Sequence, residues 1–365
     1  MVTVTQTETK ADITLSNLLE TTRSQATRHQ YHKGLDYFMG YIGLGREYDK
    51  LIERNPKDIQ QLICSWIIGL KKTKSSATIS TYLAGVKKFL IMNDIEGINW
   101  YRVHNYEPEK IRTHADREYS REEIQTLLEK ADYRNRAIIY LMSSAGLRVG
   151  ALPSLKLRHL IPIDKYNIYK VIVYEGTKSQ YYSFTTPECR AAVEKYFSFR
   201  ERCREILTED SPLFRGEINY RRTVRGNNQQ INCKVKPIFI DSINQAIIAL
   251  QKQTGVNVTG KVHLTHGFRK YFMTTAIKAG MSPLYAKILM GHSLGIVDSA
   301  YIKINETDIL EGNDKLVGYT GIIDALTIDE SQRLRHENQG LKIRSDKVDK
   351  IMQEFDEVKK RLGIP

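Results

Sequence analysis

Residues 263–301 read HLTHGFRKYFMTTAIKAGMSPLYAKILMGHSLGIVDSAY and predict two short helices separated by tight turns. Thr265 is placed to cap the first helix, whose first turn carries His266 and Arg269 on one face. Behind them, apolar residues recur at helical spacing, which predicts a buried stripe with the His–Arg pair facing outward. These apolar residues are Phe268, Phe272 and Ala276.

The second helix of this stretch is expected to begin at Ser282 and Pro283, because proline has no N–H to lose at a first helical position. Leu284 and Ile288 are expected to face the core, and Gly291 ends the helix. The next residue therefore lies at a turn that can aim its side chain into a cleft.

That residue is His292, and Tyr301 follows nine positions later. A helix N-terminus, an arginine, two histidines and a tyrosine in one short stretch are groups that bind an anion, and a phosphate in particular. Each feature alone also fits a structural role: the His–Arg pair could be exposed surface residues, Gly-His a turn, and the tyrosine a half-buried packing residue. The functional interpretation depends on their joint order.

The composition favours a nucleic-acid partner. The 365 residues carry 55 Lys+Arg against 42 Asp+Glu, a formal net charge of +13, which points to a polyanion. A generally basic surface without a specific partner is the alternative. The N-terminus has no signal-peptide pattern and no run reaches about 18 apolar residues, so a soluble, cytoplasmic protein is expected. The four cysteines lack CxxC spacing and predict reduced thiols and no metal site.

Helical periodicity, charge and turn residues divide the chain into five expected segments. They are a flexible tail (1–12), an all-helical domain (13–101), a linker (102–118), a second domain (119–325) and a C-terminal coiled-coil-like helix (326–365). Four helices are expected in the all-helical domain, one of them capped by Ser75. Basic residues near this helix form either a solvated face or a DNA-facing surface. They include Lys74, Lys87 and Lys88.

The second domain is expected to open with a capping box at Ser120 and Glu123. An apolar helix over 136–144 then stops at Ala145-Gly146, and Arg148 follows directly. By itself, Arg148 fits a structural arginine paired with a buried carboxylate as well as it fits an anion ligand.

Alternating β-branched residues over 167–174 and 180–184 predict a β-hairpin with Lys178 at its tip. Without further context a lysine there is a solvated charge. Helices are expected over 188–204 and 238–251. Between them lies a basic, apolar-poor excursion, which is either a solvated loop or a surface near DNA. Its arginines include Arg221, Arg222 and Arg225.

The C-terminal segment carries apolar residues seven positions apart, which is a coiled-coil spacing. They are Leu334, Leu341, Val348, Phe355 and Leu362. Self-association between protomers is favoured, and the alternative is a single helix lying on its own domain.

The joint pattern resembles the tyrosine recombinases, the phage-integrase family. It consists of Gly-Leu-Arg at 146–148, HxxR at 266–269, Gly-His at 291–292 and Tyr301. The resemblance implies a mostly α fold with a small β-hairpin or sheet. An N-terminal helical core-binding domain would precede a mixed α+β catalytic domain and a C-terminal helix. Ala151 stands where the family has Glu, which leaves open how Arg148 is oriented.

The resemblance also implies what the chain does. Tyr301 would attack double-stranded DNA to form a 3′-phosphotyrosyl link, without metal or nucleotide cofactor, in a tetramer on the DNA. The implied catalytic residues are Arg148, Lys178, His266, Arg269, His292 and Tyr301. The proposed DNA-binding residues are Lys74, Lys87, Lys88, Arg221, Arg222 and Arg225.

Two other functions stay open at this point. One is a type IB topoisomerase, which relaxes supercoils with the same class of residues, and the other is a DNA-binding accessory protein without catalysis. The sequence also leaves open the DNA site, the choice among integration, excision and dimer resolution, host or mobile-element origin, and whether an accessory directionality factor takes part.

Overall fold

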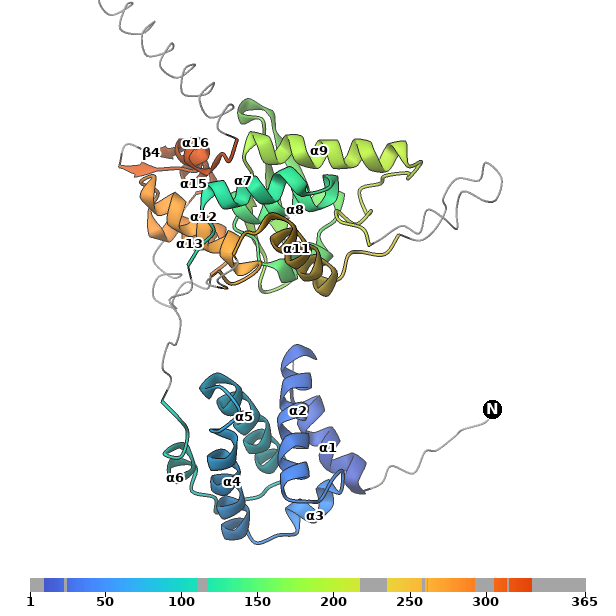
Figure 1. The fold of residues 1–365 in the computed structure, drawn as a ribbon, viewed down its shortest axis with the longest axis vertical. Coiled ribbons are helices and arrows are strands. Elements are labelled where there is room, and N and C mark those ends of the chain that lie inside the picture. The colour runs from blue at the N-terminus through green and yellow to red at the C-terminus, as the bar shows by residue number, and fades with distance from the viewer. Residues whose placement is uncertain are drawn as a thin grey trace, which may run out of the picture. The chain divides into compact units, whose positions relative to one another are not determined.

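The computed structural model describes residues 10–22, 25–109, 117–216, 235–257, 260, 262–292, 305–313 and 315–329. Tyr301, the three arginines at 221, 222 and 225, and the heptad segment lie outside these residues. The chain divides into two compact units, 1–113 and 114–365 (Figure 1). Each unit has its own hydrophobic core. Within the described residues, no helix is both long and apolar enough to cross a membrane.

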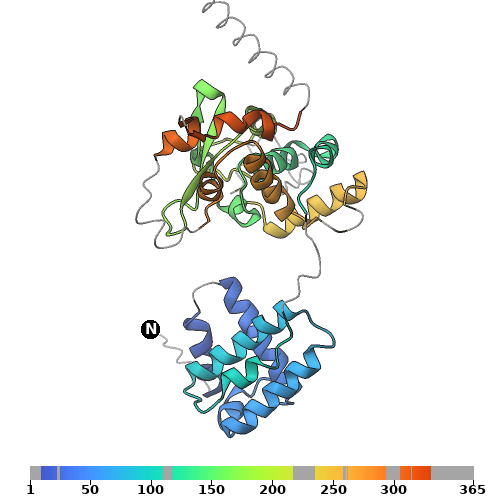
Figure 2. The same ribbon diagram turned by 90° about the vertical axis from the view of Figure 1, so that its left-hand side faces the viewer.

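The described part of the N-terminal unit is all helical, as expected (Figure 2). Its helices are α1 (Lys10–Glu20), α2 (Gln25–Tyr41), α3 (Tyr48–Ile52), α4 (Pro56–Leu70), α5 (Ser76–Met92) and α6 (Trp100–His104). Helix α1 starts at Lys10, so residues 10–12 of the expected tail are helical. The short helices α3 and α6 were not expected, since five residues are too few to show a helical period.

Capping residues set where two of these helices begin. The predicted cap Ser75 accepts a hydrogen bond from Thr78 N at 3.3 Å, and Asn55 accepts one from Lys57 N at 2.9 Å. Each bond satisfies a backbone donor that the helix leaves free. Helices α2 and α5 then pack against each other, and Leu35, Phe38 and Val86 are fully buried.

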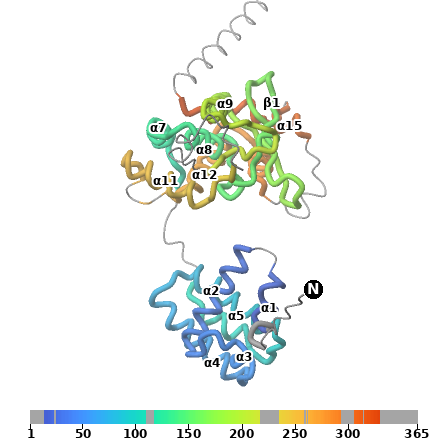
Figure 3. Tube along the Cα trace, turned by 90° about the vertical axis from the view of Figure 1, so that its right-hand side faces the viewer, coloured from blue at the N-terminus to red at the C-terminus, as the bar shows by residue number. Residues whose placement is uncertain are grey.

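The C-terminal unit combines helices with a small sheet, which confirms the expected fold class. Its longer helices are α7 (Arg121–Lys130), α8 (Tyr133–Ser144), α9 (Pro187–Arg202), α11 (Ile240–Thr254) and α12 (His266–Lys278). Its shorter helices are α13 (Pro283–Leu289), α15 (Glu306–Glu311) and α16 (Ile323–Leu326). Four 3₁₀ turns are described: η1 (Val149–Ser154), η2 (Leu157–His159), η3 (Asp164–Tyr166) and η4 (Thr320–Ile322). Helices α8 and α9 lie side by side (Figures 1 and 3).

The main sheet is antiparallel, in the order β1-β2-β3. Its strands are β1 (Leu160–Ile163), β2 (Ile168–Val173) and β3 (Tyr181–Phe184), and a two-stranded ribbon pairs β4 (Gly312–Asn313) with β5 (Leu316–Val317). The predicted hairpin is β2–β3. Strand β1 was not expected, because it has four residues and contains Pro162, which is tolerated only because β1 is an edge strand.

Helices α8 and α12 pack against each other, and their junction brings two predicted motif residues, Gly146 and Arg269, together. Helix α8 ends at Ser144, and Gly146 adopts a φ of +62°. A Cβ added to Gly146 would lie 2.6 Å from Phe272 Cδ1, so glycine allows both the turn and the close packing. The capping box at the start of α7 is also confirmed: Glu123 N donates to Ser120 Oγ at 3.2 Å.

The core face of α13 differs from the prediction. Leu284 and Ile288 are half-buried, whereas Tyr285, Ala286 and Leu289 are the buried residues. Because α13 has only seven residues, two apolar positions do not determine which face points inward.

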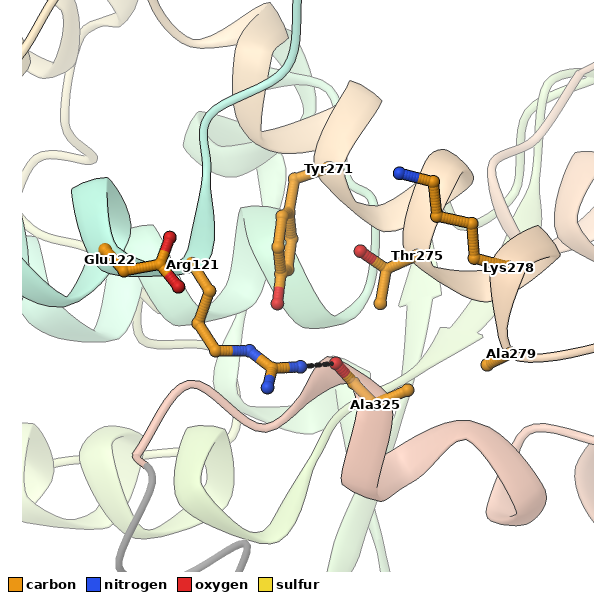
Figure 4. A pocket seen from close by; sticks show the side chains of 7 residues that line it. All are labelled: Arg121, Glu122, Tyr271, Thr275, Lys278, Ala279 and Ala325. Atoms are coloured by element: carbon orange, nitrogen blue, oxygen red, sulfur yellow. Dashed lines mark hydrogen bonds between the residues drawn. The ribbon is translucent and has the colours of Figure 1, made fainter.

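The described end of the chain packs onto this same unit. The buried Glu188 of α9 accepts hydrogen bonds from Ile328 N at 2.7 Å and Asp329 N at 3.1 Å. Arg121 donates to the carbonyl of Ala325, beside a cleft that Tyr271 also lines (Figure 4). Residues 326–329, which were expected to begin the C-terminal helix, therefore belong to the folded C-terminal unit.

Candidate active site

A cleft of about 540 Å³ lies between the β2–β3 hairpin, the turn after α8 and the end of α13. Arg148, Lys178 and His292 all line it, although they are far apart in the sequence. Three of the six expected catalytic residues thus share one cavity.

Arg148 follows the α8 turn and is half-buried. Its Nη1 donates to the carbonyl oxygens of Met290 and Gly291, both at 3.3 Å. Ala151, at the family's Glu position, is fully buried, and its N donates to Arg148 O at 2.9 Å. Two backbone carbonyls therefore hold the guanidinium, which answers the question that the missing carboxylate raised.

Arg269 lies near Arg148 and is only 2% exposed. Its Nη1 donates to Gly146 O at 2.5 Å and its Nη2 to Met290 O at 2.6 Å. The prediction that Arg269 faces outward with His266 was wrong: only His266 is exposed. The carbonyls that end α8 and α13 offset the cost of burying the guanidinium, and periodicity alone does not reveal such partners.

The Met290 carbonyl accepts from both guanidinium groups and so joins them. Burial and the charge of Arg148 lower the pKa of Arg269 to about 10, which still leaves Arg269 charged at neutral pH. Two cations held this close repel each other, and an anion between them would relieve that repulsion.

His292 directly follows the turn at Gly291, and its backbone N donates to Lys287 O at 3.0 Å. Partial burial, followed by the charges of Arg269 and Arg148, lowers the pKa of its imidazole. His292 is therefore neutral at neutral pH and can still donate one hydrogen bond. His266, the first residue of α12, also contributes to lowering this pKa, so it lies near the same group.

Lys178 is exposed on the loop between β2 and β3, as predicted. The loop is tightened by Gly176 N, which donates to Gln180 Oε1 at 2.7 Å. The lysine thus stands at the rim of the cleft, within a turn that has its own internal bonds.

The remaining expected residues divide into two groups. Tyr301 and Arg221, Arg222 and Arg225 lie outside the described residues. In the N-terminal unit, Lys74 Nζ lies 5.2 Å from the Tyr37 ring centroid and Lys87 Nζ lies 5.1 Å from that of Trp100, while Lys88 is half-buried.

Two tyrosines of the cleft were not among the expected residues. Tyr174, which directly follows β2, and Tyr181, the first residue of β3, both line it, with ring centroids 6.2 Å apart. The predicted hairpin could have indicated both tyrosines, because residues that flank a turn at Lys178 can face the same cavity as the lysine. The carbonyls of Gly146 and Met290 had no such signal, since every residue has a carbonyl.

Comparisons with known proteins place the chain in one family. The model of the phage integrase family matches residues 118–307. The chain is 22% identical to the tyrosine recombinase XerC of Leptospira interrogans (strain 56601) over 302 residues, which cover 80% of this chain and 88% of the relative.

Solved structures share the fold. The Tn1549 transposon integrase in complex with circular intermediate DNA has a TM-score of 0.55 at 15% identity, covering 80% of this chain and 96% of that one. A lambda integrase tetramer bound to a Holliday junction has a TM-score of 0.53 at 14% identity, covering 80% and 76%. With more than half of its length matched by the family model, the chain belongs to the phage integrase family, the tyrosine recombinases that exchange DNA strands.

Proposed function

We propose that this chain cuts and rejoins double-stranded DNA at specific sites through a 3′-phosphotyrosyl link formed by Tyr301. The observation that carries the proposal is the Met290 carbonyl, which joins the guanidinium groups of Arg148 and Arg269 beside His292. This pair of fixed cations next to a cleft is suited to a phosphodiester whose negative charge grows as a nucleophile adds.

Each side chain has a role that its surroundings support. Arg148 and Arg269 would bind the two non-bridging oxygens, and neutral His292 would donate a hydrogen bond to one of them. His266 would assist phosphate binding and proton movement at the start of α12. The two arginines and His292 do not have to rearrange to reach the transition state, because backbone carbonyls and turns already hold them in place.

The covalent step needs a nucleophile and a proton donor. The Tyr301 hydroxyl would pass its proton to His266 as its oxygen attacks the phosphorus, and the new P–O bond forms as the bond to the 5′ oxygen breaks. Lys178, at the cleft rim, would give its proton to that departing oxygen. The 5′-hydroxyl of a partner strand would later reverse the step, so the link keeps the bond energy and no cofactor is required.

The proposed assembly is a tetramer on DNA. The lambda integrase structure that shares this fold is a tetramer on a Holliday junction, and the heptad segment offers a means of self-association. Lys74, Lys87, Lys88, Arg221, Arg222 and Arg225 are proposed to contact DNA phosphates.

A nicked suicide duplex tests the proposal. The chain first selects its binding sequence from a pool of random duplexes, and a nick is then placed so that the cleaved strand diffuses away. Wild type is expected to accumulate a covalent protein–DNA adduct, whereas Tyr301→Phe binds with unchanged affinity and forms none. Tyr133→Phe, at an exposed tyrosine of α8, is the control.

The same preparation separates the alternatives. An accessory protein would bind the duplex without any adduct, which contradicts the proposal. A type IB topoisomerase would form the adduct and relax a supercoiled plasmid, but it would not exchange strands between two sites on separate duplexes.

A further inference from the structure

Tyr181 lines the cleft, and the proposed mechanism assigns it no role. It is the first residue of β3, three positions after Lys178, and it lines the cleft with Arg148 and His292. Its position on a strand makes it part of the scaffold rather than of the exposed loop. Its surroundings show two separate contacts with the catalytic groups.

The first contact is between the ring and the turn that carries His292. Gly291 has a φ of +61°, and a Cβ added to it would lie 2.4 Å from Tyr181 Cδ1. The ring therefore packs directly on the backbone of Gly291, the residue before His292. Tyr174, directly after β2, packs against this ring in an edge-on arrangement. Any movement of this ring would move the backbone that aims His292.

The second contact is between the hydroxyl and the buried arginine. Burial raises the pKa of the Tyr181 hydroxyl, and the neighbouring Arg269 charge partly opposes that shift. The hydroxyl is buried, yet within the described residues it has no hydrogen bond of good geometry. A buried hydroxyl that makes no well-formed hydrogen bond adds little to stability, so the effect of this hydroxyl falls on its polar neighbour, the Arg269 guanidinium.

We infer that Tyr181 is a positioning residue of the active site, whose ring fixes the Gly291–His292 turn and whose hydroxyl orients the Arg269 guanidinium. Arg269 is already held by Gly146 O and Met290 O on one side. The hydroxyl dipole beside it limits the direction in which its remaining donors point. This inference rests on the proposed recombinase function and extends it to a residue outside the six expected ones.

Tyr181→Phe tests the hydroxyl alone, because the ring that packs on Gly291 remains. On the nicked suicide duplex, we expect unchanged DNA affinity, an unchanged melting temperature and a single-turnover cleavage rate about tenfold lower. Tyr182→Phe is the matched control: it removes the same atom from the next residue of β3, whose ring contacts Phe184 instead of the cleft. It should cleave at the wild-type rate.

A second substrate shows whether the hydroxyl acts through Arg269. A methylphosphonate at the scissile position replaces a charged non-bridging oxygen with a neutral methyl group, so that neutralisation by arginine matters less. The ratio of wild-type to Tyr181→Phe rates should therefore be smaller on this substrate than on the phosphodiester. A purely structural role would lower both rates equally.

Three results would overturn the inference. They are a Tyr181→Phe rate equal to wild type, an equal loss on both substrates, or a loss that follows a lowered melting temperature. Each of these leaves the recombinase proposal intact, because wild type still forms its adduct. If wild type forms no adduct on the selected duplex, the proposed function and this inference both fail.

Discussion

At the residue scale, Arg269 cannot be replaced by lysine, although both are cations. Its guanidinium spans Gly146 O and Met290 O and still has donors left for a ligand, whereas an ammonium is a single point. Arg269→Lys is therefore expected to lower single-turnover cleavage by about a hundredfold or more. DNA affinity should change little, because most binding energy comes from other phosphates.

The measurement is adduct formation on the nicked suicide duplex, alongside a binding titration. Arg190→Lys is the control, since Arg190 forms its ion pairs with Asp164 and Glu194 on the outer side of α9. An Arg269→Lys variant that cleaves as fast as this control would show that bidentate contact is not needed.

Single residues also show how far the sequence could predict the site. Arg148, Lys178 and His292 were predicted from the resemblance to the tyrosine recombinases, and they line one cleft. Tyr181 was not predicted, because its importance depends on Gly291, which is more than a hundred positions away. The Met290 carbonyl could not be predicted at all, since backbone acceptors carry no residue-type signal.

At the scale of elements, Glu188 connects α9 to the C-terminal segment and makes that connection depend on pH. Burial raises its pKa from 4.5 to about 7, against the lowering effect of the Ile328 and Asp329 N–H groups. Between these values the folded state keeps a proton that the unfolded state has released. The free energy of unfolding should therefore decrease as pH rises from 4.5 to 7, and this contribution stays constant above 7.

Glu188→Gln removes this titration and should flatten the pH dependence. The difference in unfolding free energy between wild type and Glu188→Gln is expected to change by about 1–3 kcal/mol across that window. Thermal unfolding of the full chain at several pH values measures it. Glu201→Gln, at an exposed position of α9, should follow wild type. Parallel pH curves for wild type and Glu188→Gln would contradict the assignment.

Helices and strands were predicted best where they are long and where capping or turn residues mark their ends. The capping box of α7 and the hairpin β2–β3 were found because cap chemistry and alternation are local. Strand β1 and the buried face of α13 were not, because their few residues take their structure from tertiary packing.

At the scale of the whole molecule, net charge and periodicity predicted two folded units and a DNA partner, but they could not place the last residues. The described chain up to Asp329 packs onto the catalytic unit through Leu326 and Ile328, both at most 1% exposed. The heptad pattern lies beyond this point. Folding and self-association should therefore be separable at Asp329.

A chain truncated after Asp329 tests this separation. We expect a melting temperature within a few degrees of the full chain, because Glu188 and Arg121 keep their partners. Self-association in sedimentation should weaken, since the seven-residue apolar repeat is gone. Adduct formation on a suicide duplex should persist, whereas exchange between two sites, which needs several protomers, should decrease.

The full-length Leu341→Asp and Val348→Asp double variant is the matched control, because it breaks the repeat without shortening the chain. If both variants associate and recombine like wild type, the segment does not join protomers, and the alternative of a helix lying on its own unit is favoured.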